Sequence, residues 1–553
     1  MADIVILNGR VITFAGASET GPDAEALAIT NGLIEAVGTA SQIREIAGSA
    51  KVIDAAGATV LPGFIDSHVH LFGGSAELDY LNLTGVSGIP ALTTAAKEYA
   101  DTRPDDKIIF AVSIDYRAAG DRDTTRHDLD AVMPDRPFAA MAADHHTVWA
   151  NTMALEMAGL LHGATVPEGS EVVMADDGKA SGELRETGAF EPIMALTSLG
   201  GRDLLGYVTG KDPNPAATAQ ERILDKSVIA RGMQHCASHG ITGLHNMDGN
   251  FYQGELLSEM EHEGSLLCRT EVPMHLKGHD SLDRLQEAAQ MRAQFATDYV
   301  WSNRVKMFMD GVIDSRTAYM LEPYPGTNNR SEALFTSDQF KEACTRADSM
   351  GLQIAVHAIG DAAVRQTLDG YQAAREANGA RDSRHRIEHI ETIHPDDIPR
   401  INALGAVASM QPLHSPAGGL FPPYRADELV HTKQIKTAFA WQTIRDTGAP
   451  VIFSTDWPVV PVDVMPSIKG AVFRPPLPDE WPDQTQSLRE SLASYTRDNA
   501  WVEFNEHRKG RLVKGMLADV VVMNSDLDAL PVEELDTARA AVTICGGRIT
   551  WQA

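Results

Sequence analysis

Cysteine is scarce in this 553-residue chain, and the four that occur, Cys236, Cys268, Cys344 and Cys545, form no Cys-x-x-Cys pair. This spacing argues against a disulfide framework or a thiolate zinc site, and it fits a reducing compartment. No apolar run reaches the roughly 20 residues that span a bilayer. The first residues also lack the basic flank and the cleavage site of a signal peptide. We therefore expect a cytoplasmic protein that has no membrane partner.

Basic residues are few relative to acidic ones. The chain has 47 lysines and arginines against 76 aspartates and glutamates, which gives a net charge of -29. Because such a surface repels phosphate, we expect no nucleic-acid partner. The hydrophobic content of 43% is ordinary for a globular protein, and the length exceeds what one core usually organises. One large catalytic-type domain with a smaller one is therefore expected.

At both ends of the chain, short apolar runs alternate with turn residues, a pattern typical of small β-sheets. Asn8-Gly9 and Asn31-Gly32 each lie between apolar runs, and this pattern predicts two hairpins in an antiparallel sheet. The C-terminal runs "ADVVVMNSDL" and "AAVTICGGRITWQ" are similar. A few hairpins at either end could not bury enough apolar surface alone. We therefore expect residues 1–60 and 506–553 to fold together as one β-sandwich.

Between these ends, short β-rich runs alternate with helical patterns. The runs are "GFIDSHVH", "GITGLHNM", "CRTEVPMHL", "RVKMFMDG", "LQIAVHAIGD", "RIEHIE", "AVASMQP" and "VIFSTDWP". Eight buried strands that alternate with helices predict an α/β fold, a (β/α)8 TIM barrel over residues 61–505. One helix should begin near Thr336, with Gln339 completing a capping box and Gly351 past its end. Residues 75–220 are too long for a loop, so we predict a subdomain inserted after the first barrel strand.

Polar side chains collect at the ends of these predicted strands: His68, His70, Lys306, His357, His389 and Asp456. In a TIM barrel the carboxyl ends of the strands carry the active site. His68 and His70 point the same way because side chains in a strand alternate with period two. A lone histidine at a strand end is more often a hydrogen-bonded core residue. Four histidines and an aspartate at matched ends instead indicate a metal centre.

Lys306 is the unusual member of this set. A buried ammonium pays a desolvation cost and would be repelled by metal ions. Reaction with carbon dioxide would convert the amine into a carbamate, an anion able to bridge two cations. The alternative is a structural salt bridge, for example with Asp310, and the residues alone favour neither reading.

The segments "PGFIDSHVH", "VKMFMDGVIDSRTA", "VHAIGDAAV", "RIEHIE", "SMQPLH" and "FSTDWPV" together resemble the amidohydrolase superfamily. They are most similar to its branch of metal-dependent hydrolases that includes N-substituted formamide deformylases. The resemblance implies one metal on His68, His70 and Asp456, a second on His357 and His389, and a carboxylated Lys306 between them. It makes the carbamate the favoured reading. Asp66 is then expected to accept a ring N–H from a ligand.

A metal pair, most plausibly zinc, would supply a bridging hydroxide that attacks a carbonyl carbon, and the resemblance implies that the bond hydrolysed is C–N. Asp456 is the candidate proton shuttle, and His414 could donate to the developing oxyanion. The candidates for substrate binding are Asp144, His146, Trp149, Arg316 and Trp457. His145 stands where this branch often has glycine. For Asp144 and His146, an inter-domain polar contact is an equally open alternative.

The expected substrate is a small molecule with an amide, N-formyl or related bond, and its identity is not predicted. A homo-oligomer is compatible with the sequence. One rival is a deaminase of a nitrogen heterocycle that uses a single metal and needs no bridging lysine. The other is a non-catalytic oligomeric relative, although such proteins typically lose metal ligands.

Overall fold

The computed structural model describes residues 2–16, 22–120, 122–143, 145–167, 169–421, 426–473 and 475–553. The chain divides into two compact units. The first comprises residues 1–71 and 233–553, and the second comprises residues 72–232. Across the described ranges, no helix combines the length and the apolarity needed to cross a bilayer.

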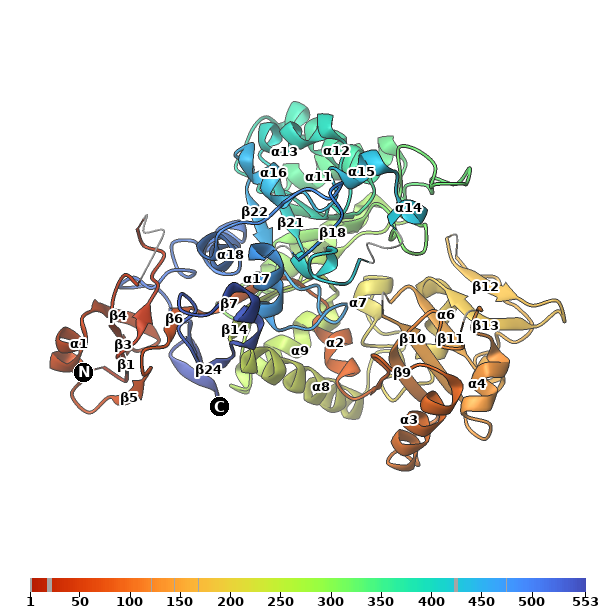
Figure 1. Ribbon diagram of the computed structural model, residues 1–553, viewed down its shortest axis with the longest axis horizontal. Coiled ribbons are helices and arrows are strands. Elements are labelled where there is room, and N and C mark those ends of the chain that lie inside the picture. Colours follow the sequence, from red (N-terminus) through yellow and green to blue (C-terminus); the bar gives the residue numbers. More distant parts are fainter. Residues whose placement is uncertain are drawn as a thin grey trace. The chain divides into compact units, whose positions relative to one another are not determined.

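The β-rich runs of the first unit form parallel strands that alternate with helices (Figure 1). The strands are β7 (Phe64–Val69), β14 (Ile241–Asn246), β15 (Arg269–Glu271), β16 (Met274–His275), β17 (Val300–Trp301), β18 (Arg304–Phe308), β19 (Gln353–Ala358), β20 (Arg386–His389), β21 (Val407–Met410) and β22 (Val451–Phe453). The main helices between and after them are α9 (Phe251–His262), α10 (Leu285–Gln294), α11 (Ser337–Ser349), α12 (Asp361–Asn378), α13 (Ile398–Leu404), α16 (Trp441–Asp446), α17 (Val464–Val472), α18 (Leu488–Ser494) and α19 (Arg497–Val502).

These strands form two parallel ladders. One has the order β17-β15-β14-β7 and the other β16-β18-β19-β20-β21-β22. An isolated parallel bridge between Val69 and Trp457 links the end of β7 to the segment that follows β22. The strands are buried at nearly every position, as expected where both faces are covered. The predicted α/β fold is confirmed, and the arrangement is consistent with a TIM barrel.

Helix α11 shows how local signals position these elements. The Thr336 hydroxyl accepts a hydrogen bond from the backbone N–H of Gln339 at 3.3 Å, as the side chain of an N-cap residue should. The other half of the predicted capping box is wrong, because the Gln339 side chain donates instead to the Gly278 carbonyl. Gly351 follows the helix with a φ of +71°, where a residue without a side chain avoids strain.

The two ends of the chain contribute to two neighbouring sheets of the first unit. One has the order β4-β3-β1-β5 and the other β2-β6-β23-β24-β25. Their strands are β1 (Ile4–Leu7), β2 (Arg10–Val11), β3 (Ala26–Thr30), β4 (Leu33–Gly38), β5 (Lys51–Asp54), β6 (Thr59–Pro62), β23 (Val520–Met523), β24 (Ala540–Cys545) and β25 (Arg548–Gln552). A single hydrophobic cluster contains Leu27 and Val60 from the N-terminal part and Val520 and Ile544 from the C-terminal part. The first sheet also packs on α1 (Ala40–Ala47).

Only one of the two predicted hairpins exists. Asn31 and Gly32, both with positive φ, join the antiparallel strands β3 and β4. The hairpin at Asn8-Gly9 is wrong, because β1 pairs with β3 and, in parallel, with β5, whereas β2 pairs with β6 in the other sheet. Asn8 has a φ of 56°, so the turn is real, but it carries the chain from one sheet to the other. The prediction of a wholly antiparallel sheet is wrong for the same reason.

The second unit is built on a six-stranded sheet of order β12-β13-β11-β10-β9-β8. These strands are β8 (Leu81–Asn82), β9 (Ile109–Ile114), β10 (Phe138–Ala142), β11 (Thr147–Ala150), β12 (Glu171–Met174) and β13 (Ala180–Arg185). Its helices include α3 (Ile89–Asp101), α4 (Arg126–Val132), α5 (Thr152–Met157) and α6 (Thr187–Met194). Alternate residues of β9 enter different clusters: Phe110 packs with α5 and α6, and Ile109 packs with α3 and α4. Both faces of the sheet are therefore covered.

A buried ion pair ties the C-terminal segment to β15. The Arg269 guanidinium donates to both Asp519 carboxylate oxygens, at 2.8 and 3.1 Å, and both side chains are almost fully buried. The Gly546 amide donates to the same carboxylate at 2.7 Å. The pair therefore fixes strand β15 to the sheet that holds β23 and β24.

Asp519→Ala should lower the free energy of unfolding by about 3–5 kcal/mol, because it leaves the Arg269 charge buried without its partner. Urea denaturation of the full chain measures this loss. Glu35→Ala is the control, since it breaks an exposed pair with Lys514 and should cost about 0–1 kcal/mol. Equal losses in the two variants would contradict the role assigned to the buried pair.

Candidate metal centre

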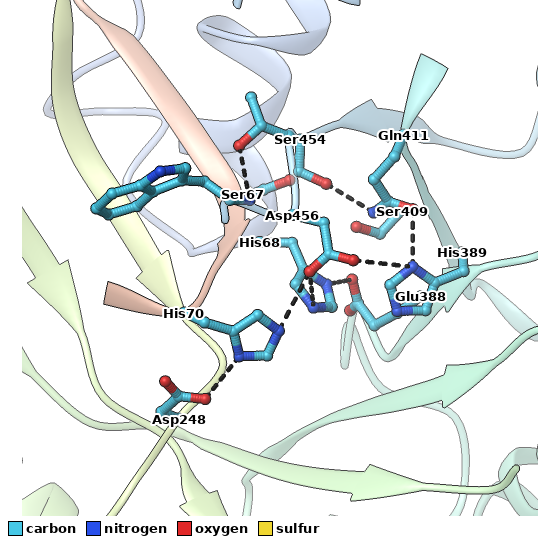
Figure 2. A network of polar contacts seen from close by, with 12 residues as sticks. Ser67, His68, His70, Asp248, Glu388, His389, Ser409, Gln411, Ser454 and Asp456 are labelled. Atoms are coloured by element: carbon cyan, nitrogen blue, oxygen red, sulfur yellow. Dashed lines mark hydrogen bonds and ion pairs between the residues drawn. The ribbon is translucent and has the colours of Figure 1, made fainter. Parts of the chain in front are cut away.

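The residues predicted as ligands lie at the carboxyl ends of the parallel strands. His68 lies on β7, Lys306 on β18, and His357 and His389 near the ends of β19 and β20. His70 directly follows β7, and Asp456 follows β22. Figure 2 shows how four of them, His68, His70, His389 and Asp456, turn towards one another.

His68, His70 and Asp456 form the first compact group. Their potential ligand atoms all lie within 4.8 Å of one another. His68 Nε2 is 3.4 Å and His70 Nε2 is 3.2 Å from the same oxygen, Asp456 Oδ1. Residues at the ends of β7 and β22, the first and the last strand of the predicted barrel, therefore meet in one potential ligand group.

A second group consists of His389, His414 and Asp456, again within 4.8 Å. The rings of His389 and His414 are stacked with centroids 6.0 Å apart, and His414 Nε2 is 3.7 Å from Asp456 Oδ2. His357 lies next to this group, with its ring centroid 4.5 Å from that of His389. His357 Nε2 is 3.1 Å from the Gly311 carbonyl. His414, predicted as an oxyanion donor, therefore also occupies a position suited to a ligand.

Acceptors on the far side of the rings hold the imidazoles in place. His68 Nδ1 is 2.8 Å from Glu388 and His70 Nδ1 is 2.6 Å from Asp248. His389 differs, because its Nδ1 is 2.9 Å from the Gln411 side-chain oxygen and the same nitrogen lies 3.9 Å from Asp456 Oδ2. In His68 and His70 an acceptor at Nδ1 fixes the tautomer in which the Nε2 of the neutral ring has the lone pair.

The predicted role of Asp66 is wrong. Its carboxylate accepts the Thr455 amide at 3.0 Å and the Thr455 hydroxyl at 2.5 Å, together with the backbone N–H of His68. The carboxylate thus accepts hydrogen bonds from Thr455 and from the backbone, whereas the ring nitrogens Nδ1 of His68 and His70 contact Glu388 and Asp248. Asp66 therefore joins β7 to the segment after β22, and Glu388 and Asp248 orient the rings.

Glu388 is itself fixed by Arg386. The guanidinium donates to both Glu388 oxygens, at 2.8 and 2.9 Å, and all of these side chains are fully buried. Two opposite charges in the buried strand "RIEH" are the sequence signal that could have identified this pair. We missed it because strict alternation places Glu388 and His389 on opposite faces.

The backbone conformation explains why the side chains of Glu388 and His389 do not follow strict alternation. His389 has a φ of 76° and Asp456 a φ of 64°, so both adopt the left-handed conformation. This conformation costs a non-glycine residue about 1–3 kcal/mol and persists where the surroundings enforce it. It turns the His389 ring towards the group that contains His68 (Figure 2).

The electrostatics of the first group suit a cation. Burial and the nearby Lys306 lower the pKa of His68 to about 3. Burial alone would also lower the pKa of His70, but Asp248 and Asp456 raise it to about 10. Burial opposes charge on Asp456 as well, yet His68 and His70 keep its pKa well below the usual value. A metal ion would therefore meet a neutral imidazole at His68 and an ionised carboxylate at Asp456, and it would have to displace a proton at His70.

Lys306 is fully buried beside these groups, and its Nζ has no hydrogen-bond partner among the described residues. Burial lowers its pKa to about 8, which increases the neutral fraction of the amine. The alternative of a salt bridge with Asp310 is wrong. The Asp310 carboxylate instead accepts three backbone amides, those of Tyr319, Ile359 and Gly360.

The residues predicted to bind substrate are spread over both units. Trp457 is buried next to Asp456, and its carbonyl accepts the His70 amide at 2.8 Å. Arg316 is exposed in the first unit. In the second unit Trp149 packs in the cluster with α3 and α4, and His146 Nδ1 contacts Glu186 at 2.9 Å. Asp144 lies outside the described residues.

The backbone at His145 explains why related proteins often have glycine at this position. Its φ is 64°, the left-handed region that glycine adopts freely. Its ring Nε2 contacts Glu77 at 2.7 Å within the same unit. This contact helps to hold a side chain where glycine would be unstrained.

Comparisons with known proteins agree with this arrangement. The family model described as "Amidohydrolase family" matches residues 51–551. YtcJ of Bacillus subtilis (strain 168), an amidohydrolase by name, is 26% identical over 548 residues, with 97% of each chain covered. The N-substituted formamide deformylase of Arthrobacter pascens is 25% identical, covering 95% of this chain and 94% of its own. The crystal structure of an uncharacterized metal-dependent hydrolase from Pyrococcus furiosus has a TM-score of 0.69 at 26% identity, covering 94% of this chain and 98% of its own. The chain belongs to the amidohydrolase family.

Proposed function

We propose that this protein is a metal-dependent hydrolase that cleaves a C–N bond in an amide, an N-formyl amine or a related small molecule. One observation carries the proposal. His68 Nε2 and His70 Nε2 both face Asp456 Oδ1, while acceptors occupy the opposite nitrogen of each ring. Two imidazole nitrogens and a carboxylate oxygen that meet at one point match the ligand types that zinc prefers, with the metal replacing the proton that His70 otherwise holds. Family membership and the similarity to a formamide deformylase support the choice of bond.

The proposed architecture is a closed (β/α)8 barrel over residues 61–505 with a subdomain inserted at about 75–220. The two parallel ladders and the bridge from Val69 to Trp457 support closure. Residues 1–60 and 506–553 form the composite β-sandwich. The hydrophobic cluster that their strands share supports this part of the proposal.

Two divalent ions, most plausibly zinc, fit the donor set. One would be held by His68, His70 and Asp456, the other by His357 and His389, with carboxylated Lys306 between them. His414 also lies beside His389 and Asp456, where its Nε2 can act either as a further ligand or as an N–H donor, and we assign it the second role. When bound, such ions acidify a coordinated water and polarise a carbonyl group.

The side chains of the chain would then handle the protons and the developing charge. Asp456 Oδ2, the oxygen turned towards His414 and away from the first group, accepts a proton during attack and returns it to the leaving nitrogen. His414 Nε2, buried and without a hydrogen-bond partner in the described parts of the chain, donates to the oxyanion. Trp457 and Arg316, with Asp144, His146 and Trp149, are the proposed substrate contacts.

Purified protein should contain about two divalent ions per chain, and their removal by a chelator should abolish hydrolysis of N-formyl and N-acyl amines. The double variant His68→Ala/His70→Ala loses two imidazole ligands, so elemental analysis should find less metal. His127→Ala, which removes an exposed histidine, is the control and should keep the metal. A single tightly held ion in the unmodified protein would favour the mononuclear deaminase instead.

Asp456→Asn keeps the size of the side chain but removes its charge and its basicity. The turnover number should fall by about 10²–10⁴-fold, the usual contribution of a positioned acid–base group. Steady-state kinetics on an N-formyl amine, with metal content measured in parallel, give the answer. Asp369→Asn on the surface of α12 should turn over at the normal rate. Normal turnover in Asp456→Asn would remove this residue from the mechanism.

Glu388→Gln should weaken metal binding by about 10–100-fold, because a neutral amide accepts the His68 N–H more weakly than a carboxylate and makes the ring a less basic ligand. Competition with a chromogenic chelator measures the affinity directly. Glu376→Gln changes an exposed residue of α12 and serves as the matched control. If both variants bound metal as the unmodified protein does, the orienting role of Glu388 would be refuted.

A further inference from the structure

We propose that His275 is a positioning residue whose ring N–H donates a hydrogen bond to the carbamate on Lys306. The inference rests on the proposed function, since it requires Lys306 to be carboxylated. It concerns a residue that neither the strand-end pattern nor the two ligand groups identified.

The register of the strands places the two side chains next to each other. β16 and β18 are adjacent and parallel, and His275 is the direct partner of Lys306. Neighbouring strands lie about 4.8 Å apart, and register partners project from the same face. His275 and Lys306 therefore extend side by side towards the same space.

Both side chains are buried without satisfied polar atoms. His275 and Lys306 are each 0% exposed. Neither ring nitrogen of His275, nor Lys306 Nζ, has a hydrogen-bond partner within the described ranges. Buried polar atoms without partners are rare and unfavourable, so three of them on two neighbouring residues need an explanation.

Phe308 connects these groups to the metal centre. Lys306 Nζ lies 4.7 Å from the centroid of its ring, and the His275 ring meets it edge to face at 5.2 Å. The His357 ring stacks on the same phenyl group at 4.9 Å. His275 belongs to neither of the two potential ligand groups found among the described residues. Its contact with Phe308 places it beside the centre, and we assign it a positioning role.

The charge around Phe308 favours an anion at Lys306. Lys277 Nζ also lies 4.8 Å from the centroid of this ring, so two ammonium groups would lie against the same phenyl group. Conversion of Lys306 to a carbamate replaces their repulsion with attraction. A neutral imidazole has one N–H donor, which matches one of the new oxygens.

The chemical step is balanced. The neutral Lys306 amine attacks the carbon of carbon dioxide, an N–C bond forms, and one C=O electron pair moves onto oxygen. The amine loses one proton to solvent. The product has two oxygens that can face the metal ions, and His275 satisfies a remaining lone pair. Loss of this hydrogen bond should make the carbamate less stable.

The test uses the full-length, metal-loaded protein with ¹³C-labelled bicarbonate. The unmodified protein should give a carbamate carbon signal by NMR, and Lys306→Ala should give none. His275→Leu, which removes the donor, should need about 10–100-fold more bicarbonate for half-maximal metal loading. His275→Asn, which keeps an N–H donor, should need much less than His275→Leu. If His275→Leu does not fold, His275→Asp, an acceptor of the same size as asparagine, takes its place in the comparison.

The outcomes separate the two proposals. A missing signal in the unmodified protein would overturn the carbamate and with it the inference. A normal signal in that protein, together with the same bicarbonate requirement in the donor-free and the asparagine variants, would overturn the role of His275 alone.

Discussion

The bidentate ion pair between Arg386 and Glu388 is the interaction on which the site depends. It lies wholly inside the first unit, and it fixes the carboxylate that faces His68 Nδ1. Arg386 also donates to the Ser67 carbonyl at 2.7 Å and the Ser409 hydroxyl at 2.9 Å. One guanidinium therefore connects β7, β20 and β21. Removal of either charge would leave the other buried and uncompensated.

The polar interior continues beyond this pair. Arg386 lies 2.9 Å from His245 Nδ1, and His245 Nε2 lies 2.8 Å from Glu503. Glu503 in turn pairs with Lys509 at 2.7 Å. Burial lowers the pKa of His245 to about 3, so this ring is neutral and connects the Arg386 cation to the Glu503 anion. Desolvation makes each of the charged groups costly without a partner. The metal centre is thus one end of a continuous buried network.

Much of this arrangement is predictable from the sequence because it depends on local patterns. The β-rich runs and the helices between them lie where periodicity and turn residues place them. His68, His70, His389 and Asp456 meet as expected, because parallel strands share one carboxyl edge. The turn at Asn31-Gly32 is also correct, since the backbone conformation there is set by two residues.

The predictions that were wrong or absent concern strand pairing and side-chain contacts that local sequence patterns do not determine. Asn8-Gly9 makes its turn, but the partner of each strand depends on which sheet buries its side chains better. Glu388 was overlooked because a left-handed His389 breaks the alternation of the strand. His275 shows no chemical pattern in "EVPMHL", and only its register with Lys306 gives it a role. Asp66 was misassigned because the donors of Thr455 come from nearly 400 residues away.

The first compact group combines His68, near the start of the chain, with Asp456, near its end, and the Asp456 amide donates to the His68 carbonyl at 2.9 Å. During synthesis, the two imidazoles leave the ribosome long before the carboxylate that completes the group. A metal ion that needs all three side chains would therefore be bound late in maturation, and a nascent chain that stalls before residue 456 would lack one member of the group.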